Sequence, residues 1–275
     1  MIRDIVTFVD GAPHTEGVGD AALLLAGQFQ AHLAVVGLPR DAGHAMHLAN
    51  APARALADAV NKAQGAAERA GSAVEQRGLA NGLSCLHQTF EVPAADYPEL
   101  VTRVARRFDI CVLSLPGAET HTEDEAIFEA VLLNSGRPVV GVPRRAAAPP
   151  KFGRVLIAWD GGRESARAVG DAMPLLERAD YVDVARIGDA AKSIDDELPG
   201  CHIAGHLARH GVSCEFRRLT GRNSVANLLL GHAAEMAADL IVMGAYRHSR
   251  WRQAVLGGAT KDIMQTTRIP LLMSR

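Results

Sequence analysis

The chain has 275 residues, of which 48% are hydrophobic, and this length is sufficient for two domains that each bury a core. Its formal net charge is −2 at pH 7 and its pI is about 6.6, so no basic excess favours binding to nucleic acid or to an anionic membrane. The four cysteines lie far apart without a CxxC pair, which argues against a zinc ribbon or a disulfide framework.

No segment reaches the roughly 18 uninterrupted apolar residues that a membrane span needs, and the first residues run directly into a strand-like segment. We therefore expect a soluble, cytoplasmic protein with reduced thiols.

Two similar halves follow one another along the chain. An apolar run that ends in Asp-Gly occurs at residues 5–11 and again at residues 155–161, and each predicts a buried strand with a carboxylate at its carboxyl end. Residues 109–113 match residues 239–243 in the same way. A charged stretch with two prolines separates the halves. The predicted organisation is a first domain over residues 1–145, a linker over 146–152 and a second domain over 153–275.

Helical periodicity follows the strands in both halves. It is clear at Ser165, Val169, Ala172 and Leu176, and an Ala-rich stripe in the longer first half predicts a helix suited to close packing: Leu56, Val60, Ala63, Ala67, Ala70 and Val74. Strands that alternate with helices predict an α/β fold made of two tandem Rossmann-like domains, each a five-stranded parallel sheet flanked by four helices.

Ligands of such sheets bind beyond the carboxyl ends of the strands, where the strand order reverses. In this chain that rule selects Asp10 and Asp160 after the first strands, and the loops that begin at Ser114 and Gly244 after the fourth.

The loop of residues 243–260 carries features of a phosphate site. Gly257 and Gly258 stand just before Ala259 and Thr260 at a predicted helix start, where bare amides and the helix dipole favour an anion. Arg247 and His248 add positive charge. The alternative interpretation, a solvated loop with two flexible glycines, stays open from the spacing alone.

These features resemble the universal stress protein family (UspA-like). ATP-binding members of that family carry a Gly-x2-Gly-x9-Gly-Ser/Thr signature, to which Gly244 and Gly257 conform, whereas Arg247 and Gly258 replace its second glycine and its hydroxyl residue. The resemblance implies that Asp160 meets the adenosine part of a nucleotide, that Met243 and Gly244 back it, and that the base is lined by Ala158, Trp159 and a residue near Arg186.

In the first half the corresponding loop, residues 114–125, ends in three carboxylates that repel phosphate, and we expect this half to be degenerate for nucleotide binding. The resemblance also implies that the halves pair within the chain through their fifth strands, at Val139, Val140, Leu271 and Leu272. Whether two chains form a homodimer stays open.

Two other patterns in the sequence are compatible with different chemistries. His202, His206 and His210 share a predicted helix face, but no acidic ligand accompanies them, so a polar face is favoured over a metal site. Residues 160–165 resemble the loop of ATP-pyrophosphatases, but Asp160 stands where that loop has serine.

No catalytic constellation is present in the sequence. The sequence therefore predicts a non-enzymatic stress-response protein that binds ATP, with magnesium, or a related adenine nucleotide in its C-terminal domain, with weak ATP hydrolysis at most. The alternative is a family member that has lost nucleotide binding and acts as an interaction module.

Overall fold

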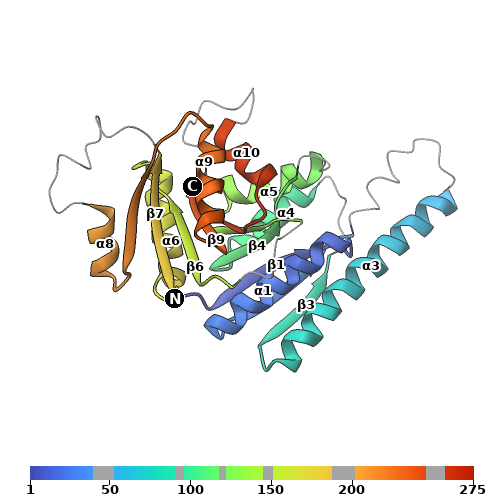
Figure 1. Ribbon diagram of the computed structural model, residues 1–275. Helices are drawn as coiled ribbons and strands as arrows, with labels where there is room; N and C mark the ends of the chain where they lie inside the picture. Colours follow the sequence, from blue (N-terminus) through green and yellow to red (C-terminus); the bar gives the residue numbers. More distant parts are fainter. Residues whose placement is uncertain (40–52, 91–95, 118–121, 145–150, 188–201, 246–257) are drawn as a thin grey trace. The chain divides into compact units, whose positions relative to one another are not determined.

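The computed structural model of the chain describes residues 1–39, 53–90, 96–117, 122–144, 151–187, 202–245 and 258–275 (Figure 1). The chain forms two compact units, Met1–Pro149 and Pro150–Arg275, called unit 1 and unit 2 below. The division between them falls inside the predicted linker of residues 146–152.

Unit 1 contains a parallel sheet in the strand order β3-β2-β1-β4-β5. Its strands are β1 (Asp4–Val9), β2 (His32–Gly37), β3 (Cys85–Thr89), β4 (Ile110–Ser114) and β5 (Val139–Val142). The central strands are buried over almost their whole length, as expected for a parallel sheet that is covered by helices on both faces.

The helices of unit 1 are α1 (Glu16–Phe29), α3 (Ala53–Ala80), α4 (Tyr97–Ala105) and α5 (Thr122–Asn134), and a short 3-10 turn, η1 (Pro13–Thr15), precedes α1. Right-handed connections place α1 and α3 on one face of the sheet and α4 and α5 on the other. In agreement, α1 packs against α3, and α4 packs against α5.

Unit 2 repeats this arrangement with the strand order β10-β9-β6-β7-β8. Its strands are β6 (Arg154–Ala158), β7 (Tyr181–Ile187), β8 (Cys214–Leu219), β9 (Leu240–Gly244) and β10 (Leu271–Ser274). Its helices are α6 (Arg163–Leu176), α8 (Ile203–Arg209), α9 (Val225–Glu235) and α10 (Gly258–Thr266).

Within the described residues each unit therefore has five parallel strands and four α-helices, which confirms the predicted α/β fold. The predicted Ala-rich helix is α3, whose buried residues include Ala63, Ala67, Gly71 and Val74, and it packs against β2 and β3. The corresponding helix of unit 2, α8, has only 7 residues.

Both sheets begin with the same carboxylate cap. Asp109 accepts hydrogen bonds from the amides of Arg3 (2.8 Å) and Asp4 (3.1 Å) at the start of β1. In unit 2, Asp239 accepts from the amides of Gly153 (3.1 Å) and Arg154 (2.9 Å) at the start of β6. The cap satisfies backbone donors that have no strand partner, and it explains why the repeat includes an aspartate.

No helix in the described part of the chain is long and apolar enough to cross a membrane. The pairing of the two units through their fifth strands stays a prediction from the sequence.

Candidate functional site at the carboxyl ends of the unit 2 strands

Asp160 follows β6 and closes a tight turn at the carboxyl end of the sheet. One carboxylate oxygen, Oδ1, accepts hydrogen bonds from the Gly162 amide (2.8 Å) and from the Ser165 hydroxyl (2.6 Å). Gly161 has a φ of +72°, a left-handed conformation that favours glycine. Because Asp160 is exposed, the turn fixes its carboxylate at the surface of the unit.

The ends of β7 and β9 lie on either side of the end of β6. Ala158 is the Cα partner of Ala185 on β7 and of Met243 on β9. The Trp159 amide donates to the Ala185 carbonyl (2.9 Å). The structure thereby brings five predicted site residues to one edge of the sheet: Ala158, Trp159, Asp160, Arg186 and Met243.

Gly244 ends β9 at a point where α6 lies close to it. A Cβ at this position would lie 2.5 Å from the Glu164 carbonyl carbon and 2.5 Å from the Ser165 nitrogen, both in the first turn of α6. Backbone atoms cannot make room for such a contact without moving the helix. Gly244 therefore allows α6 to approach β9, and this approach sets the position of the Ser165 hydroxyl that holds Asp160.

Gly258, Ala259 and Thr260 form the first turn of α10, where backbone amides lack partners within the helix. Gly258 is exposed, and no described atom lies within 4 Å of the place of a Cβ on it. Such a helix start can accept an anion. Arg247, His248 and Gly257 lie outside the described residues, so their predicted roles stay predictions.

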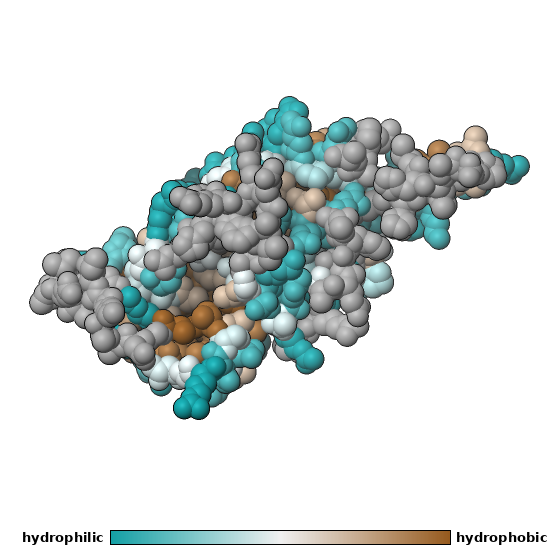
Figure 2. Space-filling model, turned by 90° about the horizontal axis from the view of Figure 1, so that it is seen from above, coloured by the Kyte–Doolittle hydropathy of each residue, from teal (hydrophilic) through white to brown (hydrophobic). Residues whose placement is uncertain are grey.

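Figure 2 looks from above, onto the end of unit 2 at which β7 and β8 finish in Figure 1. A brown, apolar area is visible in the left part of this surface, and teal residues border it. Ile187 and Leu219, which are Cα partners at the ends of β7 and β8, are both half-buried. This end of the unit therefore offers apolar surface beside a fixed carboxylate.

Unit 1 contains the same Asp-Gly turn. Asp10 Oδ1 accepts from the Ala12 amide (2.9 Å), and Gly11 has a φ of +85°. The Thr15 hydroxyl donates to the Ala12 carbonyl (2.8 Å), as the Ser165 hydroxyl does to the Gly162 carbonyl (2.9 Å). The turn is thus a property of the repeated fold.

The long helix α3 lies directly against this turn in unit 1. A Cβ on Gly11 would lie 2.7 Å from the Ala66 carbonyl oxygen, and one on Gly37 would lie 3.3 Å from the Ala67 carbonyl oxygen. Arg144, which forms an ion pair with Asp124, also feels the charge of Asp10. Burial lowers the pKa of Arg144, and the negative charge of Asp10 opposes this shift. The protein's own groups therefore occupy the strand ends of unit 1.

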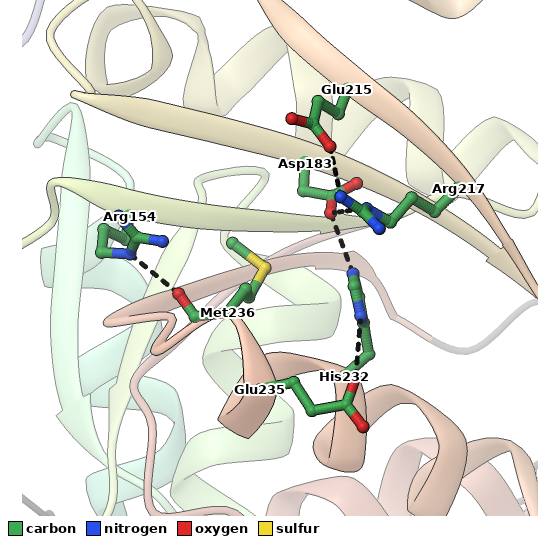
Figure 3. Close-up of polar contacts among 7 residues, drawn as sticks. All are labelled: Arg154, Asp183, Glu215, Arg217, His232, Glu235 and Met236. Atoms are coloured by element: carbon green, nitrogen blue, oxygen red, sulfur yellow. Dashed lines mark hydrogen bonds and ion pairs between the residues drawn. The ribbon is translucent and has the colours of Figure 1, made fainter.

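A polar cluster in unit 2 was missed by sequence reasoning (Figure 3). Asp183 in β7 is fully buried, and its Oδ2 lies 2.9 Å from His232 Nε2 on α9 and 3.0 Å from Arg217 Nε on β8. Arg217 also pairs with Glu215, and His232 Nδ1 lies 3.8 Å from Glu235. The signal in the sequence was a lone acidic residue between two valines in a predicted strand.

The predicted histidine face is smaller than expected. Only His206 lies within α8, because His202 and His210 flank the helix as its caps. The His202 ring packs edge-on against Phe216, with ring centroids 4.7 Å apart. Among the described residues, no three His, Cys, Asp or Glu side chains are grouped closely enough to hold a metal ion.

Comparisons with known proteins agree with this architecture. The model of the universal stress protein family matches residues 151–275. The universal stress protein Slr1230 of Synechocystis sp. is 35% identical over 77 residues. The match spans 25% of this chain and 27% of that relative, so it covers about a quarter of either protein.

Several solved structures resemble the chain over nearly its full length. A universal stress protein from Archaeoglobus fulgidus DSM 4304 superposes with a TM-score of 0.69 at 15% identity, covering 98% of each chain. A Pseudomonas aeruginosa UCBPP-PA14 protein assigned to the same family gives a TM-score of 0.60 at 16% identity, covering 99% of this chain and 93% of its own. At these identities the likeness concerns the fold, whereas the family model matches the sequence of unit 2. Residues 151–275, which span nearly all of unit 2, therefore match the universal stress protein family, and the chain as a whole shares the fold of these two structures.

Proposed function

We propose that unit 2 binds ATP or a related adenine nucleotide at the carboxyl ends of β6, β7 and β9, and that the protein acts in a stress response through this binding. The observation that carries the proposal is the exposed Asp160 carboxylate, fixed by its turn, beside the apolar ends of these three strands. A ribose offers hydroxyl donors to such a carboxylate, and a base offers a flat apolar face to the strand ends.

The first turn of α10 supplies the phosphate side of the proposed site. Its first amides, which have no partner within the helix, and the positive end of its dipole favour anionic oxygens, and Gly258 adds no side chain that would obstruct them. Magnesium would enter with the phosphates, because the chain's own described residues contain no grouped set of metal ligands. Phosphate contacts from Arg247, His248 and Gly257 belong to the same proposal.

In the proposed role, unit 2 binds the nucleotide and does not catalyse its rapid hydrolysis. The described side chains near the Asp160 turn are occupied in the turn itself: the Ser165 hydroxyl donates to Asp160, and Glu164 pairs with Arg163 (2.8 Å). Neither is arranged as a nucleophile beside a general base. We therefore expect ATP hydrolysis to be slow at most.

Isothermal titration calorimetry with ATP and magnesium tests the proposal. We expect a Kd on the order of micromolar for the unchanged protein. Asp160→Ala removes both the ribose acceptor and the turn acceptor, and we expect affinity to fall at least about tenfold. Asp160→Asn keeps an oxygen for Gly162 and Ser165, so it separates loss of charge from loss of the turn.

Asp10→Ala is the matched control, because it breaks the equivalent turn in unit 1. It is expected to leave ATP affinity unchanged. A protein that gives neither heat nor a thermal shift with ATP, ADP or AMP would instead support an interaction module without nucleotide.

A further inference from the structure

The buried carboxylate of Asp183 lies in β7 three residues before Arg186. Taking a carboxylate out of water is costly unless it is paired, and Asp183 is 0% exposed. A carboxylate only accepts hydrogen bonds, so the His232 nitrogen 2.9 Å from its Oδ2 carries the proton. Arg217 contacts the same oxygen from β8 (Figure 3).

The fold does not require this pair. Counting back from the two Asp-Gly turns through the strand registers, Ala34 holds in unit 1 the position of Asp183 in unit 2. Unit 1 has an uncharged residue at this position, although its own sheet has the same arrangement of strands. The Asp183–His232 contact is therefore a feature of the unit that carries the proposed nucleotide site.

The contact joins two sides of that site. On β7, Ala185 lies two residues beyond Asp183 and accepts the Trp159 amide (2.9 Å) at the strand ends. On the other side, His232 belongs to α9, which packs against both β7 and α10. The first turn of α10 is the proposed phosphate side, so α9 connects the buried pair to the helix that carries this side.

We propose that Asp183 and His232 form a positioning pair that holds α9 on β7 and thereby fixes the start of α10 relative to the ends of β6 and β7. This inference rests on the proposed nucleotide site and adds residues that touch no nucleotide. Arg217 forms an ion pair with the same oxygen of Asp183 from β8, whereas His232 is the partner that belongs to α9, so Arg217 is expected to contribute to stability and not to the position of α10.

Amide hydrogen exchange of the nucleotide-free, full-length protein tests the positioning step directly. His232→Ala is expected to speed exchange of the Ile263 and Met264 amides in α10 by about tenfold or more, because α9 loses its anchor. Arg217→Ala, which removes the other partner of the same oxygen, is expected to leave α10 exchange near that of the unchanged protein. His232→Gln keeps a donor at the position of Nε2 and is expected to restore protection.

Equal acceleration of α10 exchange in the His232→Ala and Arg217→Ala proteins, or no acceleration in either, would overturn the inference. ATP affinity is the second readout, and we expect it to fall in His232→Ala while Arg217→Ala keeps it. If the protein without substitutions binds no ATP, the proposed function is wrong. The comparison of exchange rates would still decide whether the pair positions α10. Binding that is equal in all variants would defeat the link to the site.

Discussion

Gly244 and Gly258 are both glycines beside the proposed site, but their surroundings are opposite. A Cβ on Gly244 would meet backbone atoms of α6 at 2.5 Å, whereas no described atom lies near the place of a Cβ on Gly258. We expect Gly244→Ala to lower the free energy of unfolding by about 1–3 kcal/mol, the cost of an overpacked contact. Gly258→Ala is expected to change it by less than about 1 kcal/mol. Urea unfolding of both variants checks this, and equal stabilities would contradict it.

The buried thiol of Cys85 makes the stability of unit 1 depend on pH. Burial, assisted by the negative charge of Glu75, raises the pKa of Cys85 from 9.0 to about 11. Between these values the thiol ionises in the unfolded chain but stays protonated in the folded one, so stability falls as the pH rises through this window. The fully buried Cys111 acts in the same direction, because burial raises its pKa too.

We expect Cys85→Ala to lose less stability than the unchanged protein when the pH is raised from 8 to 10.5. The substitution also leaves a small cavity, but that cost is the same at both pH values and cancels in the comparison. Urea unfolding at the two pH values measures the difference, and identical losses would show that the thiol is not buried as described.

At the edge of the unit 1 sheet, α3 protects the outer side of β3. The Leu33 amide bonds to the Ser84 carbonyl and the Phe90 amide to the Gly37 carbonyl, so the His87 amide between them points away from β2. Glu75 Oε1 accepts this outward amide (2.9 Å). Unpaired edge donors are sites of association between chains, and the α3 carboxylate satisfies one of them.

Glu75→Ala is therefore expected to speed exchange of the His87 amide by about tenfold and to increase self-association at high concentration. Asp58→Ala, which removes an exposed carboxylate near the start of α3, is the control for the change in charge. Exchange rates by NMR and sedimentation of both variants provide the measurement. A His87 amide that is equally protected in both would mean that Glu75 does not cap the edge.

The elements themselves were largely readable from the sequence. Strands appeared as short apolar runs and α3 as a stripe of small residues, because both patterns are local. The limits of α8 were not readable, since His202 and His210 fit a helical spacing but serve as its caps. The Asp183–His232 contact joins residues 49 apart in sequence, and no local pattern reports such a pair.

At the level of the whole chain, the same fold is used twice with unequal strand ends. The Asp-Gly turn is kept in both units, with Asp10 and Asp160 accepting from the second residue after each. The site residues predicted on β6, β7 and β9 come together because strand register fixes them. The sequence predicted a degenerate first half from its acidic loop, and the contact of α3 with Gly11 adds a second, steric reason.

The difference between the strand ends of the two units predicts that each chain binds one nucleotide and not two. In unit 1 the backbone of α3 fills the space above Gly11 and Gly37, and opening that space would expose the buried face of a 28-residue helix. The free energy lost in such an opening would be subtracted from the binding free energy of a nucleotide, which is about 8 kcal/mol for a micromolar ligand. Native mass spectrometry across an ATP titration is expected to saturate at a single bound nucleotide, and Asp160→Ala to remove it while Asp10→Ala does not. A second nucleotide bound with similar affinity would show that α3 moves aside, and the two units would then be functional equals.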